Sequence, residues 1–187
     1  MSAEQTKTRI LDAAFREFAE HGVAGARVDR IATNAGCNKN LIYVYFQSKA
    51  ALFATVLDQR FSDLYAGIPF TPEDFPGFAR RVFDYAQANP DTYRLLAWAT
   101  LEGATALPPA REHEHKRALP LIQAAQESGA IQTDAPPAMI LMSVMALATA
   151  WSPAFPFGAT TNPATDLSPD TIRDTIADMV ARIVGHS

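Results

Sequence analysis

The residues that follow Asn38 have the types and the spacing of a DNA-reading surface. Lys39, Asn40, Leu41 and Tyr43 lie close together in the chain, and a cluster of aromatic residues ends the segment. An asparagine amide can bond bidentately to N6 and N7 of adenine, and a leucine can pack against a thymine methyl group. Asn38 can start a helix by accepting a hydrogen bond from an early backbone N–H. The segment therefore predicts a very short helix shaped to lie in a DNA major groove.

Two helices must precede this segment and hold it in place. Apolar residues at helical spacing predict an amphipathic helix over 8–20, which Gly22 ends, and a two-turn helix over 28–35. The polar face of the first helix is expected to carry Lys7, Arg9, Arg16, Glu17 and Glu20. Gly36 then supplies a sharp turn. A helix, a turn containing glycine and a second helix form the helix-turn-helix pattern.

A long fourth helix is predicted to lead out of this head. Ser48 can cap it, and an apolar stripe runs along it from Leu52 to Leu64. Its roughly 18 residues span about 27 Å at about 1.5 Å per residue. A helix of this length can belong both to a DNA-reading head and to a second body.

The stretch from Gly36 to Phe53 resembles the signature of TetR-type transcriptional regulators, which commonly read Gly-Val-Ser-Lys-Gly-Thr-Leu-Tyr-Tyr-His-Phe, then Ser-Lys, then Ala-Leu-Phe. The residues that fall in register are Gly36, Lys39, Tyr43, Phe46, Ser48, Lys49, Leu52 and Phe53. The strong resemblance covers about residues 7 to 57. Beyond that stretch only the all-helical plan is similar.

The resemblance implies two sets of DNA contacts. The residues that match the family's major-groove positions are Lys39, Asn40, Leu41 and Tyr43. Those that match its phosphate-side positions are Arg27, Val28, Tyr45 and Lys49. Asn40 stands where the family usually has Gly and Leu41 where it often has Thr, and both substitutions are compatible with base readout. The resemblance also implies a homodimer in which the last two long helices pair with their copies.

The start of the second helix departs from the family pattern. Ala26-Arg27 replaces the usual Thr-Thr, so a hydroxyl cap is lost while Arg27 offers a stronger partner for phosphate. Asp29 is a carboxylate close to where DNA should lie. Either readout of a cytosine or an ion pair with Arg30 would explain it.

The distribution of charge favours a nucleic-acid partner at one end of the chain. The net charge of the 187 residues is −4, but residues 1–52 hold seven Lys or Arg against five Asp or Glu, which leaves the remainder strongly acidic. A mildly basic head on an acidic body can bind phosphate at one end and repel it elsewhere. Because the head has so few cations, a monomer should bind weakly, which favours a dimer.

Cys37 is the only cysteine, which excludes an internal disulfide and fits a reducing cytoplasm. A redox-sensing thiol is one interpretation of Cys37. A small buried apolar residue, where the family has Val, is the favoured one. The N-terminal residues show no secretion-signal pattern.

Caps and prolines divide the rest of the chain into five further helices. They are expected from Asp74, over 91–101, over 109–129 with a kink at Pro120, over 138–151, and from Ser168. The segment 138–151 is apolar on all faces, but about 14 residues are too few for the roughly 20 of a membrane span. We expect it to be buried between its own domain and a partner subunit.

A cavity for a small apolar effector is expected between the helices of the body. Its candidate lining is Phe83, Trp98, Leu101, Ile122, Met142, Met145 and Trp151. Methionine and aromatic side chains adapt to varied apolar ligands. Plain core packing is the alternative interpretation of the same residues.

The run Glu112-His113-Glu114-His115 invites a metal-site interpretation. On a helix, however, His113 and His115 point in different directions, whereas two ligands of one ion lie three or four residues apart. A solvated face with Glu112–Lys116 and His113–Arg117 neighbours is the better account. The sequence shows no nucleophile elbow, phosphate-binding glycine loop or zinc spacing, so we expect neither an enzyme nor a cofactor.

These patterns predict an all-α protein of about nine helices, with a helix-turn-helix head at 1–47 and an effector-binding and dimerisation domain at 48–187. We expect a cytoplasmic, homodimeric transcriptional regulator, specifically a ligand-responsive repressor of a near-palindromic DNA operator, with no membrane partner. Two alternatives belong to other classes. One is an enzyme that uses the body cavity, and the other is a sensor dimer whose head no longer binds DNA.

Overall fold

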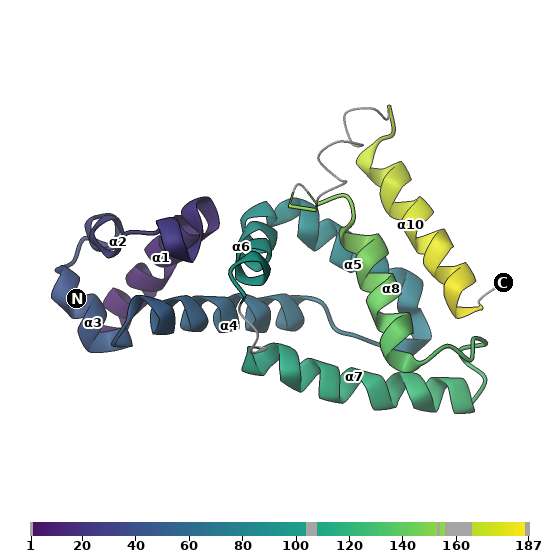
Figure 1. Ribbon diagram of the computed structural model, residues 1–187. Coiled ribbons are helices and arrows are strands. Elements are labelled where there is room, and N and C mark those ends of the chain that lie inside the picture. Colours follow the sequence, from purple (N-terminus) through teal and green to yellow (C-terminus); the bar gives the residue numbers. More distant parts are fainter. Residues whose placement is uncertain (1, 104–107, 153, 156–165, 186–187) are drawn as a thin grey trace. The chain divides into compact units, whose positions relative to one another are not determined.

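The structure is a computed structural model that describes residues 2–103, 108–152, 154–155 and 166–185. Over these residues the chain forms nine α-helices and one short 3-10 helix, with no strand (Figure 1). The predicted all-α fold is therefore confirmed. The helices pack as two compact units, Met1–Ser62 with Asp91–Ala110 and Asp63–Pro90 with Arg111–Ser187.

The first unit begins with α1 (Ala3–Gly25). A capping box starts this helix, because Ser2 Oγ accepts a hydrogen bond from the Gln5 N–H at 3.2 Å and Gln5 Oε1 accepts one from the Ser2 N–H at 3.0 Å. The helix is thus longer at its start than the sequence predicts. At its other end Gly22 has φ +67° and interrupts the helix, and one more turn follows it.

The helix-turn-helix consists of α2 (Val28–Ala35) and α3 (Lys39–Phe46). The bounds of α2 are those predicted, and Gly36 ends it in the left-handed region at φ 60°. Arg9 Nη2 of α1 donates to the Gly36 carbonyl at 3.1 Å and so ties the first helix to the turn. Side chains from the three helices form a buried core: Ile10, Ala14, Phe18, Ile31, Ile42 and Phe46.

Two further helices contribute to the first unit. α4 (Lys49–Gly67) starts as predicted at Ser48, whose hydroxyl accepts from the Ala51 N–H at 3.0 Å. Phe53 of α4 meets Phe18 edge-on, with ring centroids 5.2 Å apart. α6 (Pro90–Leu101) is followed by a turn that contains Glu102.

The second unit is built on α5 (Phe75–Ala88), α8 (Pro137–Thr149) and α10 (Pro169–Val184). α5 packs against α8 and α10, which also pack against each other (Figure 1). The 3-10 helix η1 (Pro72–Asp74) precedes α5. The buried side chains include Phe75, Phe78, Val82, Ile140, Val144, Ile172, Ile176 and Val180.

Two predicted caps are present in the second unit. Asp74 accepts from the Gly77 N–H at 2.9 Å, and Ser168 accepts from the Thr171 N–H at 3.1 Å. α7 (Pro109–Glu127) contains Pro120 in its interior. Because proline has no N–H, the carbonyl four residues before it cannot accept the usual helical bond. None of the described helices combines the length and the apolar composition that crossing a membrane requires.

Candidate nucleic-acid interface

The short helix α3 presents one polar and aromatic face. Asn38 caps it as predicted, because Asn38 Oδ1 accepts from the Asn40 N–H at 2.8 Å. Ile42 and Phe46 anchor it in the core. With those two residues buried, helical geometry turns the other side chains outward. Lys39, Asn40 and Tyr43 are exposed, and Leu41 is half-buried.

Val44 is an exposed apolar residue that the sequence analysis missed. Its side chain is 74% exposed, more than that of Tyr43 beside it. Val44 lies two positions from both Ile42 and Phe46, which are buried, so helical periodicity places it on the opposite face. That periodicity was the signal that could have found it.

An ion pair joins the two helices of the motif. Lys39 Nζ lies 2.9 Å from Asp29 Oδ1 and 3.0 Å from Asp29 Oδ2. The hydrogen bond that Lys39 donates to the Asp29 carboxylate raises the pKa of the Lys39 ammonium. Of the two explanations for Asp29, the ion pair with Arg30 is wrong, because Asp29 pairs across the turn with Lys39.

Glu17 is buried, with 5% of its surface exposed, so its predicted place on the solvated face of α1 is wrong. Its Oε1 accepts from the Arg27 N–H and from Arg30 Nε, both at 2.8 Å. Burial by itself raises the pKa of Glu17. The hydrogen bonds from Arg30 and Arg27 and the charges of Arg30 and His21 outweigh it, and the pKa is lower than usual.

This carboxylate serves the start of α2, where the sequence lacks a hydroxyl cap. Arg27 occupies the N-cap position and makes no side-chain capping bond. Glu17 reaches from α1 to the backbone of this same residue. No local pattern predicts that bond, since the two residues are ten positions apart.

The four residues predicted to lie near phosphates differ in the exposure and the hydrogen bonds of their side chains. The Arg27 side chain is exposed, whereas Val28 is buried, so that Val28 presents only backbone at the start of α2. Lys49 Nζ donates to the Ala26 carbonyl at 3.1 Å. Tyr45 is half-buried, and its hydroxyl donates to a carbonyl of the first turn of α1 at 3.5 Å.

Cys37 lies half-buried in the turn between α2 and α3. Burial raises the pKa of its thiol, and the nearby charge of Arg9 lowers it by a smaller amount, so the net shift is upward. A thiol with a raised pKa carries little thiolate near neutral pH and reacts slowly.

The seven candidate effector-lining residues divide between the two units. Trp98 and Leu101 belong to the first unit, and Leu101 is 77% exposed. The second unit holds the other five. Phe83 and Ile122 are buried there, Met145 and Trp151 are half-buried, and Met142 is 52% exposed.

The Glu-His-Glu-His run on α7 forms ion pairs along the helix. Lys116 Nζ lies 2.6 Å from Glu112 Oε1, as the predicted spacing requires, and Arg117 Nη2 lies 2.8 Å from Glu114 Oε2. Across the described part of the chain, no group of three or more His, Cys, Asp or Glu side chains could hold a metal ion.

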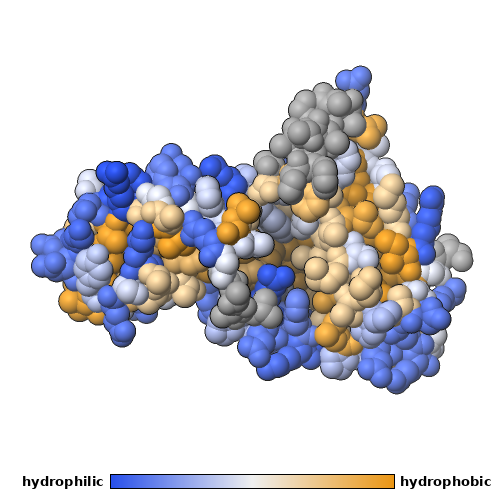
Figure 2. All heavy atoms as spheres, viewed as in Figure 1, coloured by the Kyte–Doolittle hydropathy of each residue, from blue (hydrophilic) through white to orange (hydrophobic). Residues whose placement is uncertain are grey.

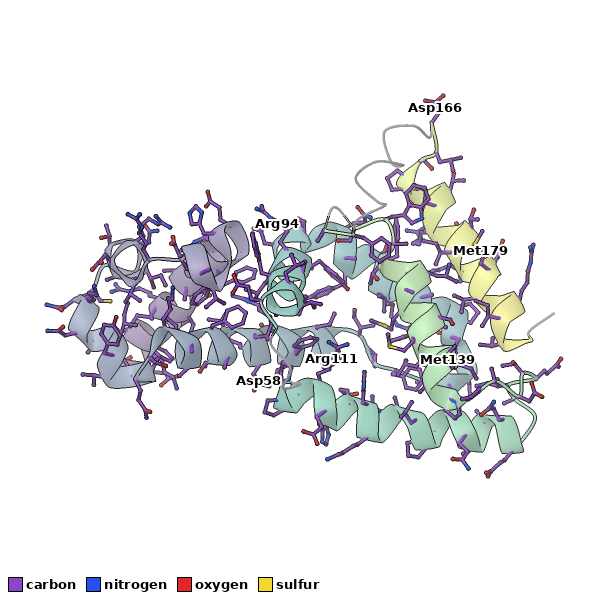
Figure 3. The ribbon with its side chains drawn as sticks, viewed as in Figure 1. Asp58, Arg94, Arg111, Met139, Asp166 and Met179 are labelled. Carbon is purple, nitrogen blue, oxygen red and sulfur yellow. The ribbon has the colours of Figure 1, made fainter. Side chains whose placement is uncertain are left out.

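An apolar surface lies over α8 and α10 of the second unit (Figure 2). Met139 of α8 is 61% exposed and Met179 of α10 is 46% exposed. Figure 3 labels both side chains on these two adjacent helices. Large exposed apolar side chains gathered on packed helices are typical of a protein–protein interface.

Two family models match the chain. "Bacterial regulatory proteins, tetR family" covers residues 10–56, and "Tetracyclin repressor-like, C-terminal domain" covers residues 74–182.

The curated relatives are regulators. The HTH-type transcriptional repressor SCO4008 of Streptomyces coelicolor is 42% identical over 156 residues, which is 82% of this chain and 81% of that protein. The HTH-type transcriptional repressor NicS of Pseudomonas putida is 32% identical, over 71% of this chain and 68% of that protein.

Among solved structures, that of SCO4942, a transcriptional regulator described from Streptomyces coelicolor, superposes with a TM-score of 0.85 at 34% identity. The match covers 97% of this chain and 99% of that one. The fatty acid degradation regulator FadR from Bacillus halodurans shares the fold, with a TM-score of 0.71 at 17% identity over 96% of this chain and 95% of that one.

Proposed function

This chain belongs to the TetR family of bacterial transcriptional regulators, which are not enzymes, and we propose that it is a homodimeric repressor of a near-palindromic operator. The observation that carries the proposal is the exposed face of α3. Its apolar anchors are buried, and Lys39, Asn40 and Tyr43 are left accessible. We place the protein in the cytoplasm, where it meets DNA.

Two groups of side chains divide the work of binding DNA. Lys39, Asn40, Leu41 and Tyr43 of α3 approach the base edges in the major groove. Arg27, Tyr45 and Lys49 contact the phosphates, together with the backbone of Val28 at the start of α2. Phosphate contacts set the register of a protein on the duplex, whereas base contacts supply the sequence preference. Asn40 has the best chemistry for an adenine, and Leu41 for a thymine methyl group.

The exposed methionines of α8 and α10 support the proposed dimer. A second copy that covers Met139 and Met179 removes their apolar surface from water, which favours association. Two symmetric heads then enter successive major grooves about one helical turn apart, so the operator has two related halves. The DNA-binding module is residues 1–47, and the remaining 48–187 provide dimerisation and effector binding.

A small, mainly apolar effector is proposed to release the DNA. The candidate lining within the second unit is Phe83, Ile122, Met142, Met145 and Trp151, and of these all but Met142 have buried or half-buried side chains. An effector can shift the protein only by binding one conformation better than another. α4 is the proposed hinge, because its residues contribute to both units.

A sensor whose head has lost DNA binding is the alternative, and two features of the sequence favoured it. One is the missing hydroxyl cap of α2, and the other is the carboxylate of Asp29. In the structure, Glu17 bonds to the backbone N–H of Arg27 at the start of α2. Lys39 forms an ion pair with Asp29 and neutralises its carboxylate. Both observations support an intact reading head.

Selection of bound sequences from a random duplex pool tests the proposal. Purified protein is used at moderate salt with no added ligand. Recovery of a near-palindrome supports a dimeric operator-binding protein and supplies the probe for an effector screen. Recovery of no preferred sequence by a folded dimer contradicts it and favours the sensor.

A further inference from the structure

The first residue of α3 carries a charge that the helix itself disfavours. Lys39 begins the helix, and the first turn of α3 contains no acidic residue. The N-terminal end of a helix bears a partial positive charge, so a cation there is destabilised. A counter-charge for Lys39 therefore has to come from another element.

α2 supplies the counter-charge. Both oxygens of the Asp29 carboxylate lie within 3.0 Å of Lys39 Nζ. Arg30, the cation next to Asp29 in the chain, points its Nε at the two oxygens of Glu17, at 2.8 and 3.1 Å. Glu17 thus engages Arg30, and Asp29 is left to hold the lysine of the reading helix.

We propose that Asp29 is a specificity-determining residue that keeps Lys39 from pairing with phosphates and holds it for the base edges of the operator. The inference rests on the proposed function. On random DNA, a lysine gains affinity by pairing with any phosphate and releasing a counterion. A lysine held by a carboxylate gains less, because it must exchange one anionic partner for another.

The effect on operator DNA is smaller. Phosphate contacts carry no sequence information, whereas contacts to base edges do. With Asp29 present, the Lys39 ammonium stays beside the α2–α3 turn, next to the exposed Asn40. The Asp29 carboxylate therefore lowers affinity for random DNA more than affinity for the operator. The ratio of operator affinity to random-DNA affinity rises as a result.

The test compares the wild type with Asp29→Asn, Lys39→Ala and the double variant, on the selected operator and on a random duplex of equal length. Asp29→Asn should raise affinity for the random duplex about fivefold per freed lysine at physiological salt and should lower the operator-to-random ratio. The log–log salt slope on random DNA should steepen by about 0.9 per freed lysine. In the Lys39→Ala background, Asp29→Asn should leave that slope unchanged.

Asp12→Asn is the matched control. Asp12 is also a carboxylate of the first unit in an ion pair, with Arg60 Nη2 at 3.4 Å, and its side chain is 50% exposed. Its substitution should leave the operator-to-random ratio unchanged. In the free protein, Asp29→Asn should lower the pKa of the Lys39 amine, followed by side-chain NMR, because the hydrogen bond that raises it is weakened.

Three results would overturn the inference. The first is that the ratio and the slope are unchanged in Asp29→Asn. The second is that Asp29→Asn steepens the slope equally with and without Lys39. The third is that Asp29→Asn changes the base preference at one operator position even in the Lys39→Ala background. The last result would mean that Asp29 contacts a base itself. A wild type without salt-dependent DNA binding would overturn the proposed function as well, whereas the three results above leave that function intact.

Discussion

Trp98 of α6 lies directly against Gly22, the residue at which α1 is interrupted. A Cβ atom added to Gly22 would meet Trp98 Cε3 at 2.8 Å and Glu102 Oε1 at 2.6 Å. The Glu102 carboxylate accepts hydrogen bonds from the backbone N–H groups of Val23 and Ala24, at 3.1 and 3.2 Å. The end of α1 is thus held by the end of α6, which lies about 80 residues further along the chain.

Gly22→Ala should destabilise the protein through two separate effects. Gly22 combines φ +67° with ψ −179°, a conformation essentially limited to glycine, so alanine there costs about 1–3 kcal/mol, and the close contacts with Trp98 and Glu102 add about 1–3 kcal/mol. Gly103→Ala is the control for an alanine at positive φ without close neighbours, because Gly103 has φ +72° and no atom within 4 Å of the added Cβ. Urea unfolding measures both variants. Equal losses of unfolding free energy would show that the Trp98 contact is not tight.

Glu17→Gln should destabilise the chain by about 1–3 kcal/mol at neutral pH, because it weakens charged hydrogen bonds to Arg27 and Arg30. The pKa of Glu17 is lower in the folded chain than in the unfolded one. Its ionisation therefore contributes stability above the unfolded pKa, and this stability is lost as the pH falls through the folded pKa.

The pH dependence of the Glu17 contribution can be measured by urea unfolding between about pH 7 and pH 3. The difference between wild type and Glu17→Gln should narrow as the pH falls. Glu20→Gln is the control, since Glu20 lies on the same helix with its side chain 69% exposed. A difference that stays constant with pH would contradict the assigned role of the carboxylate.

Substitutions in the reading head should separate two kinds of DNA contact. Asn40→Ala or Tyr43→Ala should weaken operator binding by about 1–3 kcal/mol, with less effect on random duplex. Lys49→Ala should weaken binding to both and reduce the salt slope by about 1. Fluorescence anisotropy at several salt concentrations measures all three. Unchanged binding and slope in Lys49→Ala would remove it from the DNA contacts.

Met179→Asp should dissociate the proposed dimer. An unpaired charge buried in each half of the interface costs about 3 kcal/mol or more, which corresponds to at least about a hundredfold rise in the dimer dissociation constant. Met179→Leu keeps the apolar surface and should remain dimeric. Sedimentation equilibrium distinguishes the two variants. A dimer that tolerates the aspartate must use a surface that excludes this part of α10.

Cys37 should react slowly with a thiol reagent in the folded protein at neutral pH, because burial raises its pKa. The rate should rise to that of an ordinary exposed thiol on unfolding. Operator affinity should also be unchanged after mild peroxide treatment. Rapid modification of the folded protein, accompanied by loss of DNA binding, would favour the redox-sensing interpretation.

Features that depend on neighbouring residues were predictable from the sequence. The bounds of α2 and the caps at Asn38, Ser48, Asp74 and Ser168 follow from contacts within one helical turn. The burial of Glu17 could not be predicted in this way, because a glutamate on an amphipathic helix is normally solvated. Its burial depends on Arg30, which approaches only after α2 has packed on α1. The partner of Asp29 was missed for the same reason, since ten residues and a turn separate it from Lys39.

The bond from Glu17 to the start of α2 also sets a rule for building chimeric regulators. A recognition segment that starts at residue 27 and is moved into another scaffold would leave Glu17 behind. Arg30 moves with the segment and would therefore lose the buried carboxylate that it pairs with. The smallest segment that can be exchanged without separating Arg30 from its carboxylate partner therefore begins before Glu17, inside α1. Conversely, a recipient that keeps threonine at the start of this helix already supplies its own hydroxyl cap and has no need of the glutamate.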